Sequence, residues 1–201
     1  MKSIEAGDSA CSRSGAPEND QVVEHTRRWI SSIVIGLGLC PFARQVLDMG
    51  RIRFAVSCSR DENTLLNDLA SELHLVLASP STQIETTLLI HPFVLGNFLD
   101  YNDFLGVVDQ FLKKMRLHGT IQVASFHPLY RFAETEPDAA ENYTNRSPYP
   151  MLHLLRETSV SQAANASDEV LKIPRRNIET MRSLGQEKIL KRLQTVDAEQ
   201  Q

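Results

Sequence analysis

Short apolar segments alternate with longer amphipathic segments through the middle of the chain, and this alternation constrains the fold most. Extended segments are expected at 52–58, 85–90 and 121–126. Amphipathic helices are expected between them, with apolar residues at helical spacing at Leu65, Leu69, Leu73 and Leu77 and from Phe104 to Met115. Strands joined by helical crossovers usually pair in parallel. The expected fold is therefore α/β, with a small, mostly parallel three-stranded βαβαβ sheet.

Local signals predict where helices begin around this sheet. Residues 59–62, Ser-Arg-Asp-Glu, have the form of a capping box and open the first crossover helix. Asp100 is placed to cap the second crossover helix. An N-terminal helix is expected at about 20–37. A short helix should begin at Pro41, with Cys40 as its N-cap, because proline is favoured at the first helical position.

The last third of the chain begins with a polar loop at 129–147, and loops of this length are often functional. Ser147 and Pro148 are then expected to cap and start a helix that carries Leu152 and Leu155 on its inner face. Two further helices, at about 159–166 and 174–184, would complete a C-terminal helical extension.

The chain of 201 residues suits one domain. We expect a disordered tail at 1–19, a single α/β domain at 20–195 and a flexible tail at 196–201. The first tail is rich in Ser, Gly, Asp and Glu and has no apolar periodicity, so it lacks the means to join a core.

Composition limits the classes of binding partner and the cellular compartment that we expect. The formal net charge is −4, so no basic surface for nucleic acid or anionic lipid is expected. The 3 cysteines form no disulfide framework and favour reduced thiols. The N-terminus lacks the apolar core of a signal peptide, and the richest apolar stretch, 33–42, is too short to span a membrane. These features predict a soluble, cytoplasmic protein whose oligomeric state is left open.

Two histidines stand where expected strands end. His91 follows the second strand and His127 follows the third, and each is followed by proline, which keeps the backbone extended. If the strands are parallel, both histidines lie at the carboxyl edge of the sheet, where open α/β sheets bind ligands. Each could instead be a hydrogen-bonded histidine that only completes a strand end. The other histidines are expected on helices and receive no role.

Cys40 is a third candidate for chemistry. A thiol at a helix N-terminus meets unpaired N–H groups and the positive end of the helix dipole, which favour the thiolate. The alternative is a small buried residue among Leu39, Phe42 and Ala43. Cysteine and histidine also suit zinc, but the spacing of Cys40, His91 and His127 matches no recognised metal signature. We therefore assign no metal and no cofactor.

The expected helix start at Ser147 suggests an anion site. Its free backbone donors lie beside Asn145 and Arg146, and Arg131 belongs to the same loop. Together these residues could hold a carboxylate or a phosphate. The alternative is an ordinary capped turn in which Arg146 pairs with Glu134 or Asp138.

Several motifs resemble those of one uncharacterised, mainly bacterial family of about this length that is catalogued only as a domain of unknown function. They are Leu39-Cys40-Pro41-Phe42-Ala43, Thr86–Pro92, Gln122–Pro128 and Thr144–Pro150. The resemblance covers about Gln21 to Leu184 and implies no activity, substrate or cofactor. The chain departs from it at Glu134, where the resemblance implies a glycine.

These observations favour an enzyme that acts on a small anionic molecule as a cysteine- or metal-dependent hydrolase or transferase. Cys40, His91 and His127 are the catalytic candidates, and Arg146, Asn145, Ser147 and Arg131 are the anion-binding candidates. One alternative is a non-catalytic protein that binds a small ligand or regulates. Another is a protein-interaction module that uses the C-terminal helices.

Overall fold

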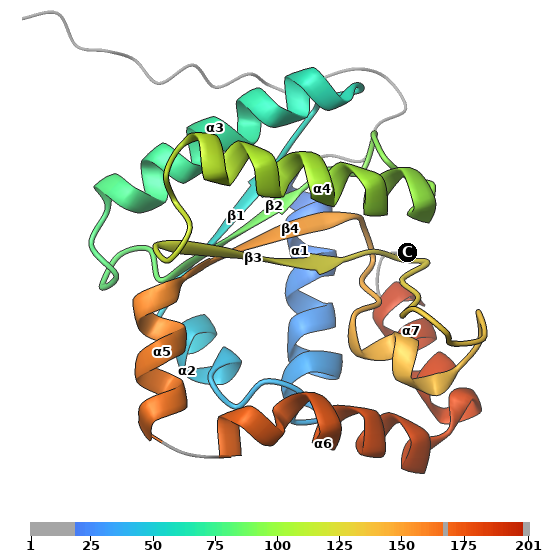
Figure 1. Ribbon diagram of the computed structural model, residues 1–201. Helices are drawn as coiled ribbons and strands as arrows, with labels where there is room; N and C mark the ends of the chain where they lie inside the picture. Colours follow the sequence, from blue (N-terminus) through green and yellow to red (C-terminus); the bar gives the residue numbers. More distant parts are fainter. Residues whose placement is uncertain (1–18, 167–168, 199–201) are drawn as a thin grey trace, which may run out of the picture.

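The computed structural model describes residues 19–166 and 169–198 and places a four-stranded sheet between two layers of helices (Figure 1). The strands are β1 (Ile52–Val56), β2 (Thr86–Ile90), β3 (Ile121–Phe126) and β4 (Met151–Arg156). Their order across the sheet is β1-β2-β4-β3. Residues 1–18 of the first expected tail and 199–201 of the second lie outside the described residues.

The sheet is mixed. β1 and β2 are parallel, and β4 is antiparallel to both β2 and β3. β1, β2 and β3 therefore run in one direction, with β4 inserted between β2 and β3. The expected set of three parallel strands is wrong in this respect, because β4 adds a fourth strand that separates two of them.

β4 replaces the helix that was expected after Ser147. Leu152 and Leu155 are three positions apart, which fits a helix, but a strand covered on both faces also carries apolar residues at any spacing. β4 is such a strand, since Leu152 and Leu154 are fully buried on one side and Met151 on the other. Apolar spacing could not distinguish the two structures here.

Two crossover helices cover the upper face of the sheet in Figure 1, α3 (Glu62–Ala78) and α4 (Phe98–Lys114). Their N-caps are Asp61, which accepts a hydrogen bond from the N–H of Thr64 at 2.9 Å, and Asn97, which accepts from the N–H of Leu99 at 2.8 Å. Asp61 lies inside the expected capping box, whereas Asp100 is in the first turn of α4 and is not its cap. The apolar faces of both helices form one core with β2 and β4.

The remaining helices lie on the lower face (Figure 1). α1 (Asn19–Trp29) continues into a π-helical turn, η1 (Ile30–Ile35), and the short α2 (Ala43–Asp48) follows. α5 (Glu157–Ala166), α6 (Glu169–Leu184) and α7 (Gln186–Ala198) form the C-terminal extension. The N-cap of α2 is Phe42, so the expectation that Cys40 caps this helix is wrong. Within the described ranges, no helix is long and apolar enough to cross a membrane.

Candidate functional site

His91 and His127 are neighbours at the carboxyl edge of the sheet, as the sequence predicts. Both imidazoles lie against the ring of Tyr101, which α4 contributes, at centroid distances of 5.8 and 5.0 Å. The rings are on the α4 side of the sheet, and both residues have no exposed surface. The common direction of β2 and β3 brings them together even though β4 runs between these strands.

Hydrogen bonds fix the protonation of both rings, because backbone carbonyls only accept and backbone amides only donate. Nε2–H of His127 donates to the carbonyl of Leu95 at 3.0 Å, and its Nδ1 accepts from the N–H of Leu129 at 3.0 Å. Nδ1–H of His91 donates to the carbonyl of Val94 at 3.1 Å. The remaining nitrogen of His91, Nε2, is buried and has no partner among the described residues.

Burial keeps both rings neutral. Burial, with a smaller contribution from the nearby His127, lowers the pKa of His91 to about 4. Burial likewise lowers the pKa of His127. Both rings are neutral and have no exposed surface. Their hydrogen bonds to the carbonyls of Val94 and Leu95 connect the ends of β2 and β3 to residues 94–95.

Cys40 lies in a different part of the molecule. Its neighbour Leu39 packs in the lower core, on the opposite face of the sheet from the two imidazoles. The side-chain amide of Asn177, from α6, donates to the carbonyl of Leu39 at 2.8 Å and fixes this turn. The thiol of Cys40 is free and partly exposed. No group of three metal-ligating side chains occurs in the part of the chain that the structure describes.

Cys58 follows β1 and is disulfide-bonded, so the expectation of reduced thiols is wrong at this position.

The anion-binding candidates lie in and beside the loop that follows β3. The guanidinium of Arg146 donates to the carbonyls of Tyr130 and Pro137 and stacks 4.2 Å above the ring of Tyr143. Asn145 donates its side-chain N–H to the carbonyl of Ser125 at 3.1 Å. The hydroxyl of Ser147, which starts no helix, donates to the carbonyl of Tyr149 at 2.7 Å. These side chains bind backbone carbonyls of the loop and of the end of β3, and Arg131 is exposed.

Glu134 adopts a left-handed backbone conformation, with φ of 63°. This region favours glycine, the residue that the family resemblance implies at this position. The backbone at position 134 therefore has the conformation that glycine favours, although the residue there is a glutamate.

Glu134→Gly should raise the free energy of unfolding by about 0.5 kcal/mol, because relief of about 1 kcal/mol of backbone strain exceeds the added entropy of the unfolded chain. Urea denaturation would measure the change. Glu136→Gly is the matched control, because Glu136 is also exposed in this loop and has no positive φ. Equal destabilisation by both substitutions would contradict the strain at Glu134.

The lower face of the sheet is covered unevenly. α1 packs on β1, and α5 meets β4 near its end. The side chains of Phe126, Ala124, His153 and Leu155 share the lower face, because they alternate with residues of the upper core and because Phe126 contacts Trp29 of α1. All four remain partly exposed. An interior strand such as β4 seldom leaves side chains accessible, so this half of the lower face is open.

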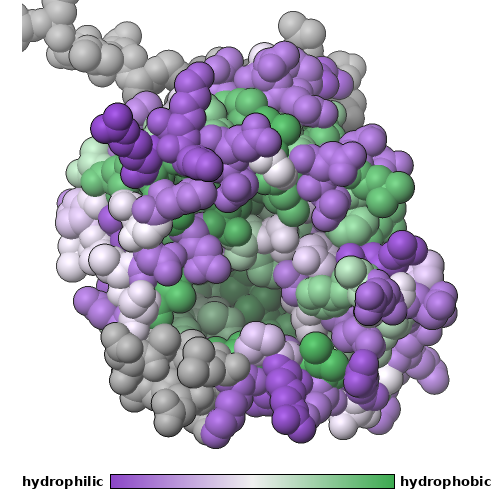
Figure 2. All heavy atoms as spheres, in the orientation of Figure 1, coloured by the Kyte–Doolittle hydropathy of each residue, from purple (hydrophilic) through white to green (hydrophobic). Residues whose placement is uncertain are grey.

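Figure 2 shows a hollow with an apolar interior in this place, below β3, between α5 and α1 and above α6. His153 is a polar residue of the partly exposed lower face. The hydroxyl of Thr86 donates to the carbonyl of Leu154 at 2.6 Å, so the same oxygen accepts Nε2–H of His153 at 2.7 Å. Nδ1 of His153 consequently carries a lone pair. Among the described residues it has no partner, and it is not one of the atoms sealed from solvent.

The surroundings of His153 keep it neutral. Desolvation by burial lowers its pKa to about 4, although part of the residue remains exposed. Sequence reasoning missed this residue because it placed His153 on a helix. The available signal was a polar residue within an otherwise apolar segment, Met-Leu-His-Leu-Leu.

The fold and the hollow define a mixed α/β protein with a partly uncovered sheet face. A family model described as a protein of unknown function (DUF1415) matches residues 21–191, and the chain belongs to this family. No curated protein and no solved structure matches the chain.

Proposed function

We propose that this protein binds a small, mostly apolar molecule in the hollow below β3 and β4. A hydroxyl or N–H group of the ligand donates a hydrogen bond to Nδ1 of His153. The observation that carries this proposal is the free acceptor of His153, which Thr86 holds in one tautomer on the partly exposed face of an interior strand. Pockets for small molecules are typically apolar with a few fixed polar groups.

Binding is favoured over catalysis at this position. A general base works best when its pKa is near the operating pH, and the pKa of His153, about 4, is well below neutrality. A neutral imidazole remains a good hydrogen-bond acceptor across the physiological range. The enzymatic hypothesis at Cys40, His91 and His127 is less favoured, because Leu39 and the two imidazoles lie on opposite faces of the sheet.

Phenol and toluene are suitable probes, because they share a ring and differ in the hydroxyl group. Phenol should bind at millimolar concentration and shift the amide resonances of β3 and β4 in two-dimensional NMR spectra. His153→Phe keeps a ring of similar size and removes the acceptor. It should reduce the preference for phenol over toluene by about 2- to 10-fold, the range expected for one hydrogen bond.

A second pair of variants tests the location. Ala124 pairs with His153 across the strands and shares its face, so Ala124→Trp should fill the hollow and abolish binding of both probes. Ala78→Trp is the control, because Ala78 is exposed at the end of α3 on the opposite side of the sheet. Unchanged phenol binding in Ala124→Trp would disprove the site.

A further inference from the structure

β3 is an edge strand whose outer side is open. It pairs only with β4 among the described residues. The hydroxyl of Tyr101 bridges the N–H of Phe126 and the carbonyl of Met151, which shows that even-numbered residues of β3 direct their backbone groups toward β4. Odd-numbered residues therefore direct theirs outward. Asn145 donates to the outward carbonyl of Ser125. Among the described residues, both backbone groups of Val123 and the N–H of Ser125 are left without a partner.

This edge lacks the features that normally prevent strand pairing. Exposed edge strands usually carry charged residues, proline or a bulge. β3 reads Ile-Gln-Val-Ala-Ser-Phe and contains no charged residue and no proline. The opposite edge, β1, carries Arg53, which is paired with Glu72 at 2.6 Å. The lack of a charged residue on β3, in contrast to β1, indicates that the β3 edge is available for pairing with another strand.

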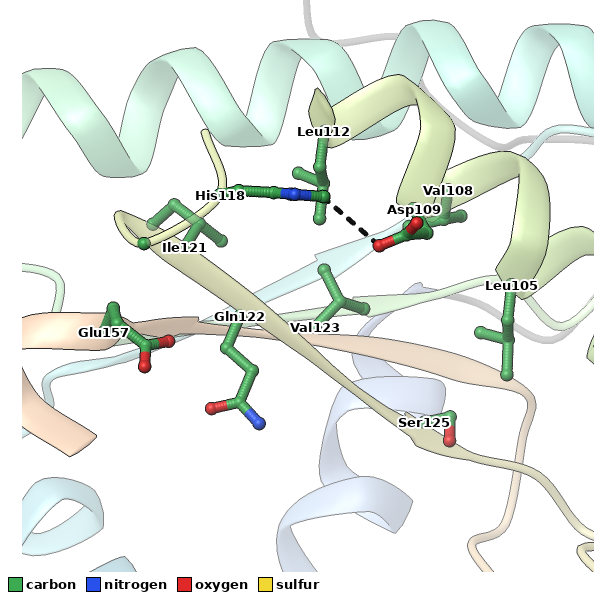
Figure 3. Close-up of a pocket in the computed structure, with 11 residues that line it drawn as sticks. Leu105, Val108, Asp109, Leu112, His118, Ile121, Gln122, Val123, Ser125 and Glu157 are labelled. Atoms are coloured by element: carbon green, nitrogen blue, oxygen red, sulfur yellow. Dashed lines mark ion pairs between the residues drawn. The ribbon is translucent and has the colours of Figure 1, made fainter. Parts of the chain in front are cut away.

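A groove of about 340 Å³ runs along this edge, between β3 and α4 (Figure 3). In Figure 3, Leu105, Val108 and Leu112 project from α4, and Val123 points up from β3 toward them. A strand added beside β3 would direct every second side chain into this groove, toward its apolar residues.

The charged side chains of the groove are acidic. Asp109 lies on its α4 wall, with the carboxylate 3.2 Å from Nε2 of His118, and Glu157 lies at its end. Lysine and arginine are absent from the residues that line it. The charge of the groove therefore complements a basic partner.

We propose that β3 and the adjacent groove bind an extended peptide segment of another protein by strand addition. The segment carries apolar residues at alternate positions and lysine or arginine beside them. Backbone hydrogen bonds to Val123 and Ser125 supply affinity, and the apolar side chains of the groove and Asp109 select the sequence. This site is on a different edge from the hollow and does not depend on the proposed ligand.

A fluorescein-labelled peptide, acetyl-Lys-Val-Thr-Val-Thr-Val-Lys-amide, tests the proposal by fluorescence anisotropy. We expect saturable binding that protects the amides of Val123 and Ser125 from hydrogen exchange. Ser125→Pro removes one outward N–H, a change that edge strands tolerate, and should weaken binding at least tenfold. Asp109→Lys should weaken it several-fold, whereas Asp103→Lys, at an exposed aspartate of α4 outside the groove, should leave it unchanged.

A peptide in which glutamate replaces both lysines should bind more weakly than the lysine peptide. Equal affinity for both, or equal effects of the two aspartate substitutions, would overturn the basic partner. Binding unaffected by Ser125→Pro would overturn strand addition. Ultracentrifugation distinguishes a second copy of the chain, because a dimer that Ser125→Pro dissociates would assign the edge to self-association and overturn the peptide occupant.

Discussion

Acidification from pH 7 to pH 4 should lower the free energy of unfolding by several kcal/mol, because the fold buries imidazoles in their neutral form. Burial lowers the pKa of His91 and of His153 from 6.5 to about 4 and also lowers that of His127. For one such histidine, the shift corresponds to about 3 kcal/mol. The unfolded chain binds these protons first, so the stabilisation is complete above pH 6.5 and is lost as the pH falls toward 4.

Urea denaturation at a series of pH values would measure this effect. His91→Gln should reduce the slope of unfolding free energy against pH, between pH 4 and 6.5, by up to about 1.4 kcal/mol per pH unit, the contribution of one proton. His74→Gln is the control, because His74 is exposed on α3. A slope that His91→Gln leaves unaltered would contradict the burial of a neutral imidazole at this position.

The strands and crossover helices could be predicted because their signals are local. β3 spans the expected residues, and β1 and β2 are shorter than expected by two residues and one residue, respectively. The strand identity of β4 could not be predicted, because a doubly covered strand has no distinctive apolar period. Its position between β2 and β3 depends on pairing between distant segments, which no local pattern encodes.

The candidate site likewise has features that the sequence predicts and features that it does not. The proximity of His91 and His127 followed from the common direction of two strands, which survives the insertion of β4. The separation of Cys40 from them could not be predicted, because sequence does not specify which face of the sheet the N-terminal helices cover. His153 was missed together with its strand. Its accessibility also depends on how far the lower helices extend across the sheet.

Asn142→Ala should lower the free energy of unfolding by about 3 kcal/mol, because Asn142 holds the long loop together. This side chain is fully buried and makes four hydrogen bonds within the loop. Its carbonyl oxygen accepts from the N–H of Phe132 and the hydroxyl of Thr135, and its amide donates to the carbonyls of Glu136 and Pro137. Alanine would leave these groups without their partner.

The effect of this substitution should extend beyond the loop. Residues 140–144 form a 3₁₀ turn, η2 (Ala140–Thr144), that packs on α6, and Glu141 pairs with Arg182 of α6 at 2.6 Å. Hydrogen exchange should therefore accelerate in both the loop and α6, which forms the lower boundary of the hollow.

Asn142→Asp tests the acceptor and the donor of the amide separately, because it keeps the acceptor oxygen and places a second oxygen against the two carbonyls. It should destabilise the protein at least as much as alanine, whereas Asn102→Ala, at an exposed position on α4, should change stability little. Equal stability of Asn142→Ala and Asn102→Ala would show that the loop is held by other contacts.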